Sequence, residues 1–326
     1  MTSAITRRGA APLAATAAGP APRPTEATNT PPAPPSSRFE TTKRAPAAAN
    51  PRDVSSTFEA LYQSAKAGTL TLPADADQYV YLMVPGFVAP KSALKPNQEA
   101  LLALGLDARM STDPELEHPV NVKASVGENA EALAASIAQL ARETGKQVIP
   151  IVHSSGAPEL HQALIDHPEL RAQVHCAIAL DGTYGGTPLA ERYENLKPVV
   201  KHAVDALAAK AGIDPQGITD VVEGNREAYL RAHPFPSDVL AFNVAASFNH
   251  GFSFLKPLVA LLRKDSPGGA SDGMVPTANQ TLPGQPVAYL GQADHSDLIT
   301  HRPFSKQSPE AITLAAVSFA LTEAAR

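Results

Sequence analysis

The 326-residue sequence has little of several residue types, and each shortage excludes a class of protein. It contains one cysteine, Cys176, so no disulfide can form within the chain. Its 27 Lys and Arg residues are outnumbered by 32 Asp and Glu residues, and they form no cluster of the kind that binds nucleic acid phosphates. No stretch reaches the roughly 20 apolar residues of a membrane-spanning helix. The composition therefore predicts a soluble protein that does not bind nucleic acid and has no transmembrane segment.

The residues that are present suffice for a large core. Hydrophobic residues make up 44% of the chain and charged residues 18%, which is typical of a globular protein. Cys176 lies in the apolar run 174–180, so we expect it to be a buried strand residue.

Residues 1–52 differ from the rest of the chain. They are rich in Pro, Ala, Ser and Thr and carry little apolar bulk to offset the entropy of ordering, so we expect a disordered tail. Arg7 and Arg8 precede an Ala-rich run with too few large apolar residues for a Sec-type signal peptide. This acid-poor start resembles the export signals of bacterial type III secretion effectors. We therefore expect a cytoplasmic protein, or one exported without a Sec-type signal, with its folded domain over residues 53–326.

Within that domain, apolar strands alternate with helical patterns. Because the strands are continuous apolar runs, the alternation predicts an α/β fold with a mostly parallel sheet and helices on both faces. Residues 189–236 carry helical patterns and no convincing strand, so we expect a helical insertion that forms a lid. The expected strands are 79–84, 108–110, 148–153, 174–180, 239–245 and 286–290, and the expected helices are 54–67, 97–104, 130–142, 157–166 and 309–324.

The apolar run that begins at Val148 stops abruptly at Ser154, Ser155 and Gly156. We interpret it as a strand that enters a nucleophile elbow with Ser154 at its tip, because a serine hydroxyl needs a tight turn and a nearby base to act as a nucleophile. Asp272 and His295 follow later strands, so the three residues occur in the order Ser, Asp, His. This order predicts a catalytic triad at the carboxyl edge of the sheet.

Several short motifs carry a family resemblance: 84–87 with Gly86 and Phe87, 153–156 around Ser154, 185–190, 272–275, and 294–295. In order and spacing, residues 77–325 resemble an α/β-hydrolase, most like a bacterial lipase or esterase. The resemblance implies an α/β-hydrolase fold, the triad Ser154, Asp272 and His295, and an oxyanion hole made by the backbone N–H groups of Phe87 and Ser155. It implies no cofactor, and no Gly-rich phosphate loop is present to hold one.

The elbow and the oxyanion loop also depart from the family pattern. Val152 and Ala157 stand where glycines are frequent, and Pro85 stands where the oxyanion loop usually has histidine. A branched side chain at position 152 implies local rearrangement of the elbow, since the family packs backbone closely there.

Other residues compete for the same roles. Ser155 is a rival nucleophile, and Asp181, which follows the strand after the elbow, is a rival acid. His153 is expected to pack at the elbow, whereas His250 or His301 could line the site.

Asp294 and Asp297 flank His295. Asp294 is expected to shape its loop. Asp297 matches a position where some bacterial lipases hold a structural calcium, but no second carboxylate upstream of Asp272 completes such a site. We therefore expect Asp297 to cap a turn and expect no metal.

These features predict a serine hydrolase that cleaves a carboxylic ester of a small molecule or lipid through an acyl-enzyme, with interfacial lipid contact at the lid. Two alternatives remain open. The same triad could serve an acyltransferase or a thioesterase. The fold could instead belong to a hydrolase-like binding protein or secreted effector that has lost turnover.

Overall fold

In the computed structural model of this chain, residues 50–90, 92–250, 252–265 and 269–326 are described. Residues 1–49 of the expected disordered tail lie outside the described part. Arg52, the last residue of that expected tail, pairs in parallel with Pro286 as part of strand β1 (Arg52–Asp53).

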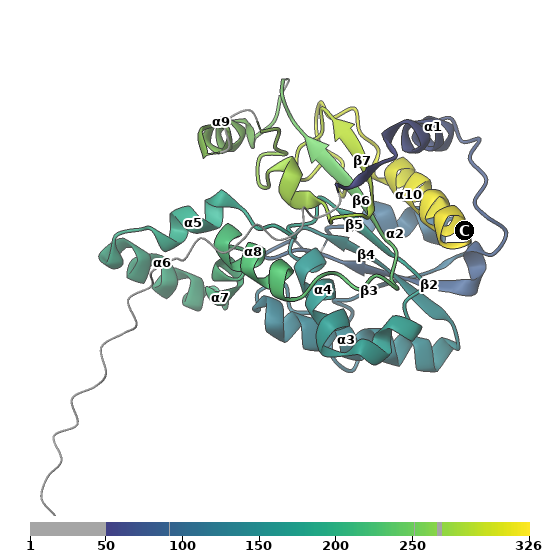
Figure 1. The fold of residues 1–326 in the computed structure, drawn as a ribbon, viewed down its shortest axis with the longest axis horizontal. Helices are drawn as coiled ribbons and strands as arrows, with labels where there is room; N and C mark the ends of the chain where they lie inside the picture. The colour runs from purple at the N-terminus through teal and green to yellow at the C-terminus, as the bar shows by residue number, and fades with distance from the viewer. Residues whose placement is uncertain (1–49, 91, 251, 266–268) are drawn as a thin grey trace, which may run out of the picture. The chain divides into compact units, whose positions relative to one another are not determined.

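The centre of the domain is a seven-stranded sheet in which every neighbouring pair of strands is parallel (Figure 1). The strand order is β1-β7-β6-β5-β4-β2-β3. Strand β4, which leads to Ser154, therefore lies inside the sheet between β2 and β5. The remaining strands are β2 (Tyr79–Val84), β3 (Asp107–Met110), β4 (Gln147–His153), β5 (Ala177–Leu180), β6 (Ala241–Ser247) and β7 (Pro286–Gly291).

The strands are apolar throughout because both faces of the sheet are covered. In β2, Tyr81 and Met83 contribute to the core on one face, and Val80 and Leu82 contribute to the core on the other. This alternation follows from the two-residue period of a strand. The expected parallel sheet with two covered faces is confirmed. Cys176 is fully buried, as expected, but it lies just before β5 and not in the strand, which begins at Ala177. Burial raises the pKa of its thiol to about 12.

Helices form a layer on each face of the sheet. Helices α1 (Ser55–Lys66) and α2 (Lys95–Leu102) each contact α10 (Pro309–Ala324), and the apolar side chains of all three belong to one core (Figure 1). Helices α3 (Val126–Thr144) and α4 (Gly156–Asp166) pack together over the other core.

Helix α3 shows how local sequence sets an element. The Ser125 side chain accepts the N–H of Glu128 in a capping box, and Gly145, at φ +67°, ends the helix. Ser125 is therefore the cap, and the helix begins about one turn before the expected start at residue 130. The chain then passes directly into β4.

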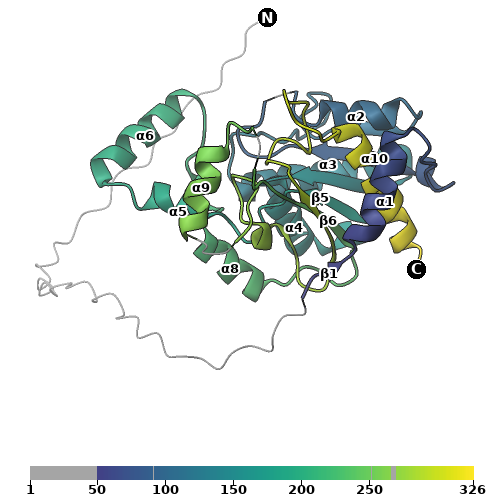
Figure 2. The same cartoon turned by 90° about the horizontal axis from the view of Figure 1, so that it is seen from above.

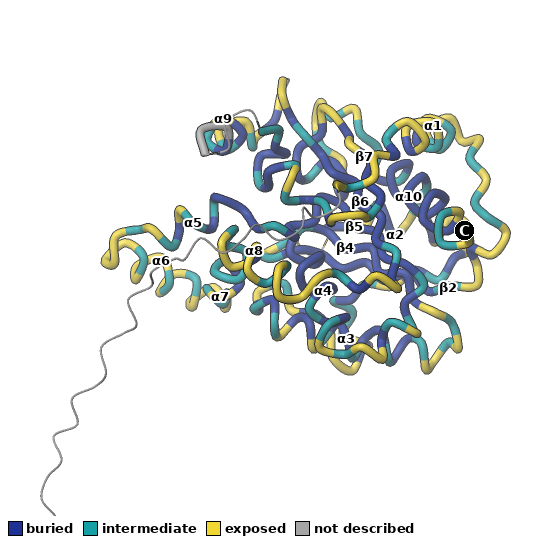
Figure 3. Tube along the Cα trace, viewed as in Figure 1, coloured by how far each residue is buried: buried dark blue, intermediate teal, exposed yellow. Residues whose placement is uncertain are grey.

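Four helices lie between β5 and β6, within the segment expected to be helical. They are α5 (Pro188–Glu194), α6 (Pro198–Lys210), α7 (Gln216–Thr219) and α8 (Glu223–Ala232). In both ribbon views α5 and α6 lie at the opposite end of the domain from α1 and α10 (Figure 2). Helix α6 has no buried residue, whereas α8 buries Arg226 (Figure 3). A further helix, α9 (Lys256–Asp265), follows β6. No helix among the described residues is long and apolar enough to cross a membrane.

Candidate active site

Ser154 occupies the turn between β4 and α4. Its φ is +54°, a left-handed conformation that is uncommon outside glycine and often found at functional sites. The backbone is held on both sides, because the Ser154 N–H donates to Leu180 O at 3.3 Å and its carbonyl accepts from Thr183 N at 3.0 Å. This geometry is that of a sharp strand-to-helix elbow, which presents the side chain above the carboxyl end of the sheet.

Glycines let the backbone pack closely around this elbow. A Cβ on Gly86 would lie 2.6 Å from Ser154 Cβ, so the loop after β2 passes directly against the serine. A Cβ on Gly156 would lie 3.0 Å from Val84 O. These close approaches explain why both positions are glycine.

The two unusual residues of the elbow are accommodated by their neighbours. Val152 is fully buried in the core beneath α3 and α4. Ala157 is also buried, and a Cβ on Gly182 would lie 2.8 Å from Ala157 Cβ, so a glycine on the next loop provides the space. The absence of a side chain at Gly182 thus leaves room for Ala157.

Asp272 and His295 form a buried hydrogen-bonded pair. His295 Nδ1 lies 2.7 Å from Asp272 Oδ2, and the His295 backbone N–H donates to Asp272 O at 3.0 Å. The Asp272 carboxylate accepts three further hydrogen bonds, from Met274 N and Val275 N at Oδ1 and from Gln280 Nε2 at Oδ2. A carboxylate that accepts Nδ1–H leaves the lone pair on His295 Nε2, which is the arrangement of a general base.

His153 connects this pair to the elbow. Its Nε2 lies 2.9 Å from His295 O, and the two imidazole rings are 4.7 Å apart. A carbonyl can only accept, so Nε2 carries the proton. Burial, and then the proximity of His295, lowers the pKa of His153 to about 3, so this residue is neutral. It packs at the elbow, as expected.

The serine and the histidine are not joined in this structure. Within the described part of the chain, the hydroxyl of Ser154 has one hydrogen-bond partner, Thr183 Oγ1 at 3.4 Å, and none to His295. Such contacts are often long or misaligned when no substrate is bound. The structure brings Asp272 and His295 into contact. Ser154 directly follows His153, the residue that packs on His295.

The rival acid, Asp181, has different partners. It is fully buried at φ +49°, and its Oδ1 accepts Ala246 N at 2.9 Å. Its Oδ2 has no hydrogen-bond partner among the residues that the structure describes. Burial, and next the charge of Asp272, raises the pKa of Asp181 well above the usual range. No hydrogen bond joins it to His295 among the described residues. Asp272 therefore fits the orienting role better than Asp181.

His153, Asp181 and His295 also have the separation of metal ligands. One ligand atom of each lies within 4.8 Å of the others, and no other such group of three occurs in the described residues. Because His295 Nδ1 is bonded to Asp272, a metal could bind only its Nε2, which is the atom that a general base needs. We therefore assign no metal to this group.

Asp297, the calcium candidate, closes a turn. Its Oδ2 accepts Asp294 N at 2.8 Å, and its own N–H donates to Asp294 O at 2.9 Å. It belongs to no group of three metal-ligating side chains within the described ranges. It caps the turn that holds His295. Asp294 in turn accepts from Ser253 Oγ and Ser296 N, which fixes the same loop.

The two remaining histidine candidates are elsewhere. His250 and His301 are exposed. Their Nε2 atoms lie near Gln292 and Glu310 respectively.

The loop after β2 carries Phe87, one of the two expected oxyanion donors. Its N–H donates to Ser155 Oγ at 2.7 Å. The Ser155 hydroxyl donates in turn to Glu159 Oε1 at 3.1 Å, and Ser155 is only 3% exposed. The Ser155 hydroxyl therefore both accepts and donates a hydrogen bond, which makes it a poor nucleophile. The other expected donor, the Ser155 N–H, has no hydrogen-bond partner in the part of the chain described.

Glu159 is a residue of this site that the sequence reasoning missed. It is 1% exposed, and burial raises its pKa to about 8. Asn129 Nδ2 donates to its Oε1 at 3.1 Å. The available signal was a carboxyl group one helical turn after Ser155, directly after Gly, Ala and Pro at the start of the helix.

A cavity of about 310 Å³ opens beside Ser154. Its wall is largely apolar and includes Phe87, Leu189 from α5, Ile218 from α7, and Met274. The helical insertion therefore forms one side of the space above the serine.

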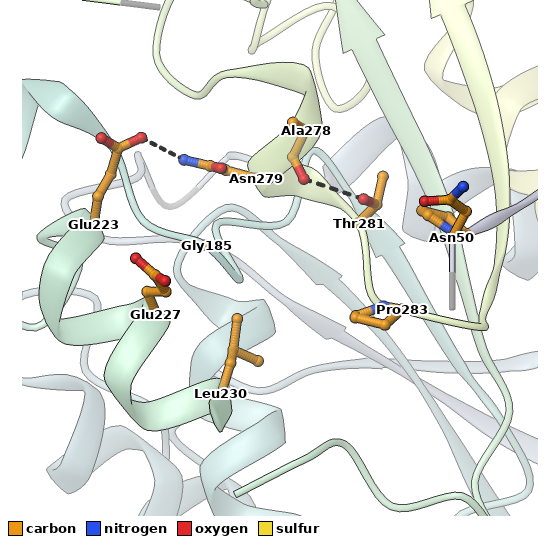
Figure 4. Close-up of a pocket in the computed structure, with 10 residues that line it drawn as sticks. Asn50, Gly185, Glu223, Glu227, Leu230, Ala278, Asn279, Thr281 and Pro283 are labelled. Atoms are coloured by element: carbon orange, nitrogen blue, oxygen red, sulfur yellow. Dashed lines mark hydrogen bonds between the residues drawn. The ribbon is translucent and has the colours of Figure 1, made fainter. Parts of the chain in front are cut away.

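A second depression, of about 520 Å³, lies between α8 and residues 277–283 (Figure 4). Glu223 and Glu227 line it from consecutive turns of α8, and Asn279 Nδ2 donates to Glu223 Oε1 at 2.6 Å. Its lining residues include no histidine that could act as a base. We therefore place the candidate active site at Ser154.

No protein-family profile and no curated protein sequence matches this chain. Solved structures do match. A metagenomic carboxyl esterase is 17% identical with a TM-score of 0.63, over 85% of this chain and 91% of that one. A Bacillus licheniformis lipase in its mature form is 19% identical with a TM-score of 0.54, over 76% and 89%. A Staphylococcus hyicus lipase is 14% identical with a TM-score of 0.55, over 78% and 97%. The chain thus has the α/β-hydrolase fold, as its motifs predicted, and its structure is similar to those of bacterial lipases and esterases.

Proposed function

We propose that this protein is a serine hydrolase of carboxylic esters, with Ser154 as nucleophile, His295 as general base and Asp272 as the residue that orients the base. The observation that carries the proposal is the 2.7 Å Asp272–His295 hydrogen bond, which is buried next to a serine held at φ +54°. The left-handed conformation of the serine supports a functional role, because residues held in such conformations cluster at active sites.

In the proposed reaction, Ser154 Oγ attacks the ester carbonyl while His295 Nε2 accepts its proton. The imidazolium returns that proton to the leaving alcohol, which leaves an acyl-enzyme. Water then attacks the acyl group by the same route and releases the acid. Asp272 holds the imidazole in the tautomer that this requires and stabilises its cation.

Ser154 must first change its partner. Its hydroxyl would rotate away from Thr183 Oγ1, a contact of 3.4 Å, toward His295. Such a contact is weak by the usual distance criteria, so the rotation costs little.

The N–H groups of Phe87 and Ser155 are the proposed donors to the oxyanion. The loss of one such donor typically reduces transition-state stabilisation by about 3 to 4 kcal/mol. The close approach of Gly86 to Ser154 supports this assignment, because it puts the oxyanion loop next to the attacking atom.

The cavity supports an ester with an apolar acyl group. At about 310 Å³ it lies at the small end of ligand sites, which are roughly 300 to 1,000 Å³. We propose that α5 and α7, which contribute to its wall, belong to a lid. Exposed apolar side chains on α6, such as Val199 at 83% and Leu207 at 69%, would contact a lipid surface.

A fluorophosphonate probe tests the nucleophile directly, since it reacts with activated serines. Wild type should be labelled and the Ser154→Ala variant should not. Thr183→Ala, which removes the hydroxyl beside Ser154, is the matched control and should still be labelled. Unlabelled wild type, or labelling of Ser154→Ala at the wild-type rate, would refute the proposal.

A screen of acyl esters of increasing chain length, with phospholipids and thioesters included, would define the substrate. Product analysis separates hydrolysis from acyl transfer to another acceptor.

The engaged Phe87 N–H also favours a second candidate, a hydrolase-like protein that binds its ligand without turnover. Intact ester after long incubation, together with measurable ligand binding, would support that candidate.

A further inference from the structure

The hydroxyl oxygen of Ser155 accepts a hydrogen bond from the Phe87 N–H group, which the proposed reaction needs as a donor to the oxyanion. Phe87 N and Ser155 Oγ are 2.7 Å apart, a short and partly buried hydrogen bond. A carbonyl oxygen cannot accept the same N–H along the same direction while Ser155 Oγ occupies it.

Two buried residues hold this hydroxyl in place. Ser155 Oγ–H donates to Glu159 Oε1, and Asn129 Nδ2 donates to the same oxygen. Asn129 is itself fixed, because its Oδ1 accepts Asn121 N at 3.1 Å. The chain of contacts from Phe87 to Asn121 therefore selects one rotamer of Ser155.

The oxyanion loop does not depend on Ser155 for its position. Val88 N donates to Val122 O, and Ala89 N donates to Gly86 O at 3.1 Å. The Phe87 ring packs so closely on α7 that a Cβ on Gly217 would lie 2.3 Å from it. Loss of the Ser155 hydroxyl should therefore free the Phe87 N–H and leave the loop in place.

We propose that Ser155 is a built-in occupant of the oxyanion site: its hydroxyl accepts the Phe87 N–H at rest and turns away when the substrate oxygen arrives. This inference rests on the proposed function, and it adds a gating residue to that site. Glu159 and Asn129 are positioning residues, since they act through Ser155.

Removal of the occupant should speed acylation. A typical hydrogen bond contributes about 1 kcal/mol net, which corresponds to a rate factor of about five. The Ser155→Ala variant should therefore react about fivefold faster than wild type with a fluorophosphonate, and its kcat/KM for a short ester should rise by a similar factor.

Ser136→Ala is the matched control. Ser136 is also buried and donates to His118 O at 3.0 Å, but it lies on α3 and takes no part in the proposed site. Its labelling rate should equal that of wild type. Amide exchange at Phe87 gives an independent readout, because the N–H should be protected in wild type and in Ser136→Ala and should exchange faster in Ser155→Ala.

A crystal structure of phosphonylated wild type tests the same point without any substitution. The phosphoryl oxygen should accept the Phe87 N–H, and Ser155 Oγ should have left it. If Ser155 Oγ still accepts that N–H in the adduct, the inference is wrong.

The outcomes separate the two proposals. Unlabelled wild type overturns the hydrolase and this inference together. Labelled wild type with Ser155→Ala at the same or a lower rate overturns the inference alone, as does unchanged exchange at Phe87.

Discussion

Asp272 and His295 are joined twice, once through their side chains at 2.7 Å and once through the His295 N–H and the Asp272 carbonyl at 3.0 Å. The double contact joins the segment between α9 and β7 to the loop that follows β7. The imidazole is therefore set by backbone as well as by side chain, which preorganises the proposed base.

Asp272→Asn should reduce activity far more than Asp181→Asn. An amide at position 272 would favour the wrong imidazole tautomer, an effect of roughly 10⁴-fold in a comparable triad. Asp181→Asn is the matched control, because Asp181 is equally buried and its Oδ1 contact with Ala246 N is available to an amide oxygen. The measurement is kcat for the best ester of the screen. Equal losses in the two variants would contradict the assignment of the acid.

Gly86→Ala should disable the site and destabilise the fold. The added Cβ would lie 2.6 Å from Ser154 Cβ, so the oxyanion loop or the elbow has to move. Overpacking of this kind costs about 1 to 3 kcal/mol. Urea unfolding and the labelling rate measure the two effects. Gly127→Ala, whose Cβ would be 3.6 Å from the nearest atom, should retain both stability and labelling.

The stability of Glu159→Gln relative to wild type should depend on pH. Burial raises the pKa of Glu159 from 4.5 to about 8 in the folded state, so the folded protein binds an extra proton between these values. The stabilisation that this proton uptake gives is fully present below the pKa of Glu159 in the unfolded chain. It is lost as the pH rises through the pKa of Glu159 in the folded protein. The variant is always neutral and does not share this loss.

The free energy of unfolding of Glu159→Gln should therefore rise relative to wild type between pH 4.5 and 8. The difference in unfolding free energy between the variant and wild type changes by at most about 1.4 kcal/mol for each pH unit. Urea unfolding at several pH values measures it. Glu99→Gln, at an exposed glutamate of α2, controls for loss of a surface carboxylate. Parallel curves for Glu159→Gln and wild type would show that this carboxyl is not protonated in the fold.

Leu207→Asp should separate lipid contact from catalysis. Leu207 is 69% exposed on α6, so the free energy of unfolding should change by less than about 0.5 kcal/mol. Hydrolysis of a dissolved short ester should stay at the wild-type rate, whereas hydrolysis of phospholipid vesicles should fall. Leu104→Asp makes the same change at an exposed residue after α2 and should leave both activities intact. Unaltered vesicle hydrolysis in Leu207→Asp would remove α6 from the proposed lipid surface.

Six of the seven strands and the order of the elements along the chain were predictable because their signals are local, whereas β1 was not predicted. Apolar runs such as 79–84 identify buried strands, and Gly145 marks a helix end without knowledge of the tertiary structure. The placement of Ser154 in a turn after β4 follows from the same kind of signal. Its catalytic role, and those of Asp272 and His295, remain predictions.

What the sequence could not predict are contacts between residues distant along the chain. The Phe87–Ser155 hydrogen bond joins residues 68 positions apart, and the choice of Gly182 to accommodate Ala157 depends on how two loops meet. Side-chain partners at a sheet edge are set by strand order and register, which no single motif encodes.

The burial of Cys176 has a practical consequence. A thiol that is 0% exposed, with a pKa raised to about 12, does not compete for maleimide reagents at neutral pH. A single cysteine placed at Lys210, on the exposed end of α6, would therefore carry a fluorophore or spin label without replacement of the native cysteine. The native sequence thus allows spectroscopy to test whether α6 moves when substrate binds.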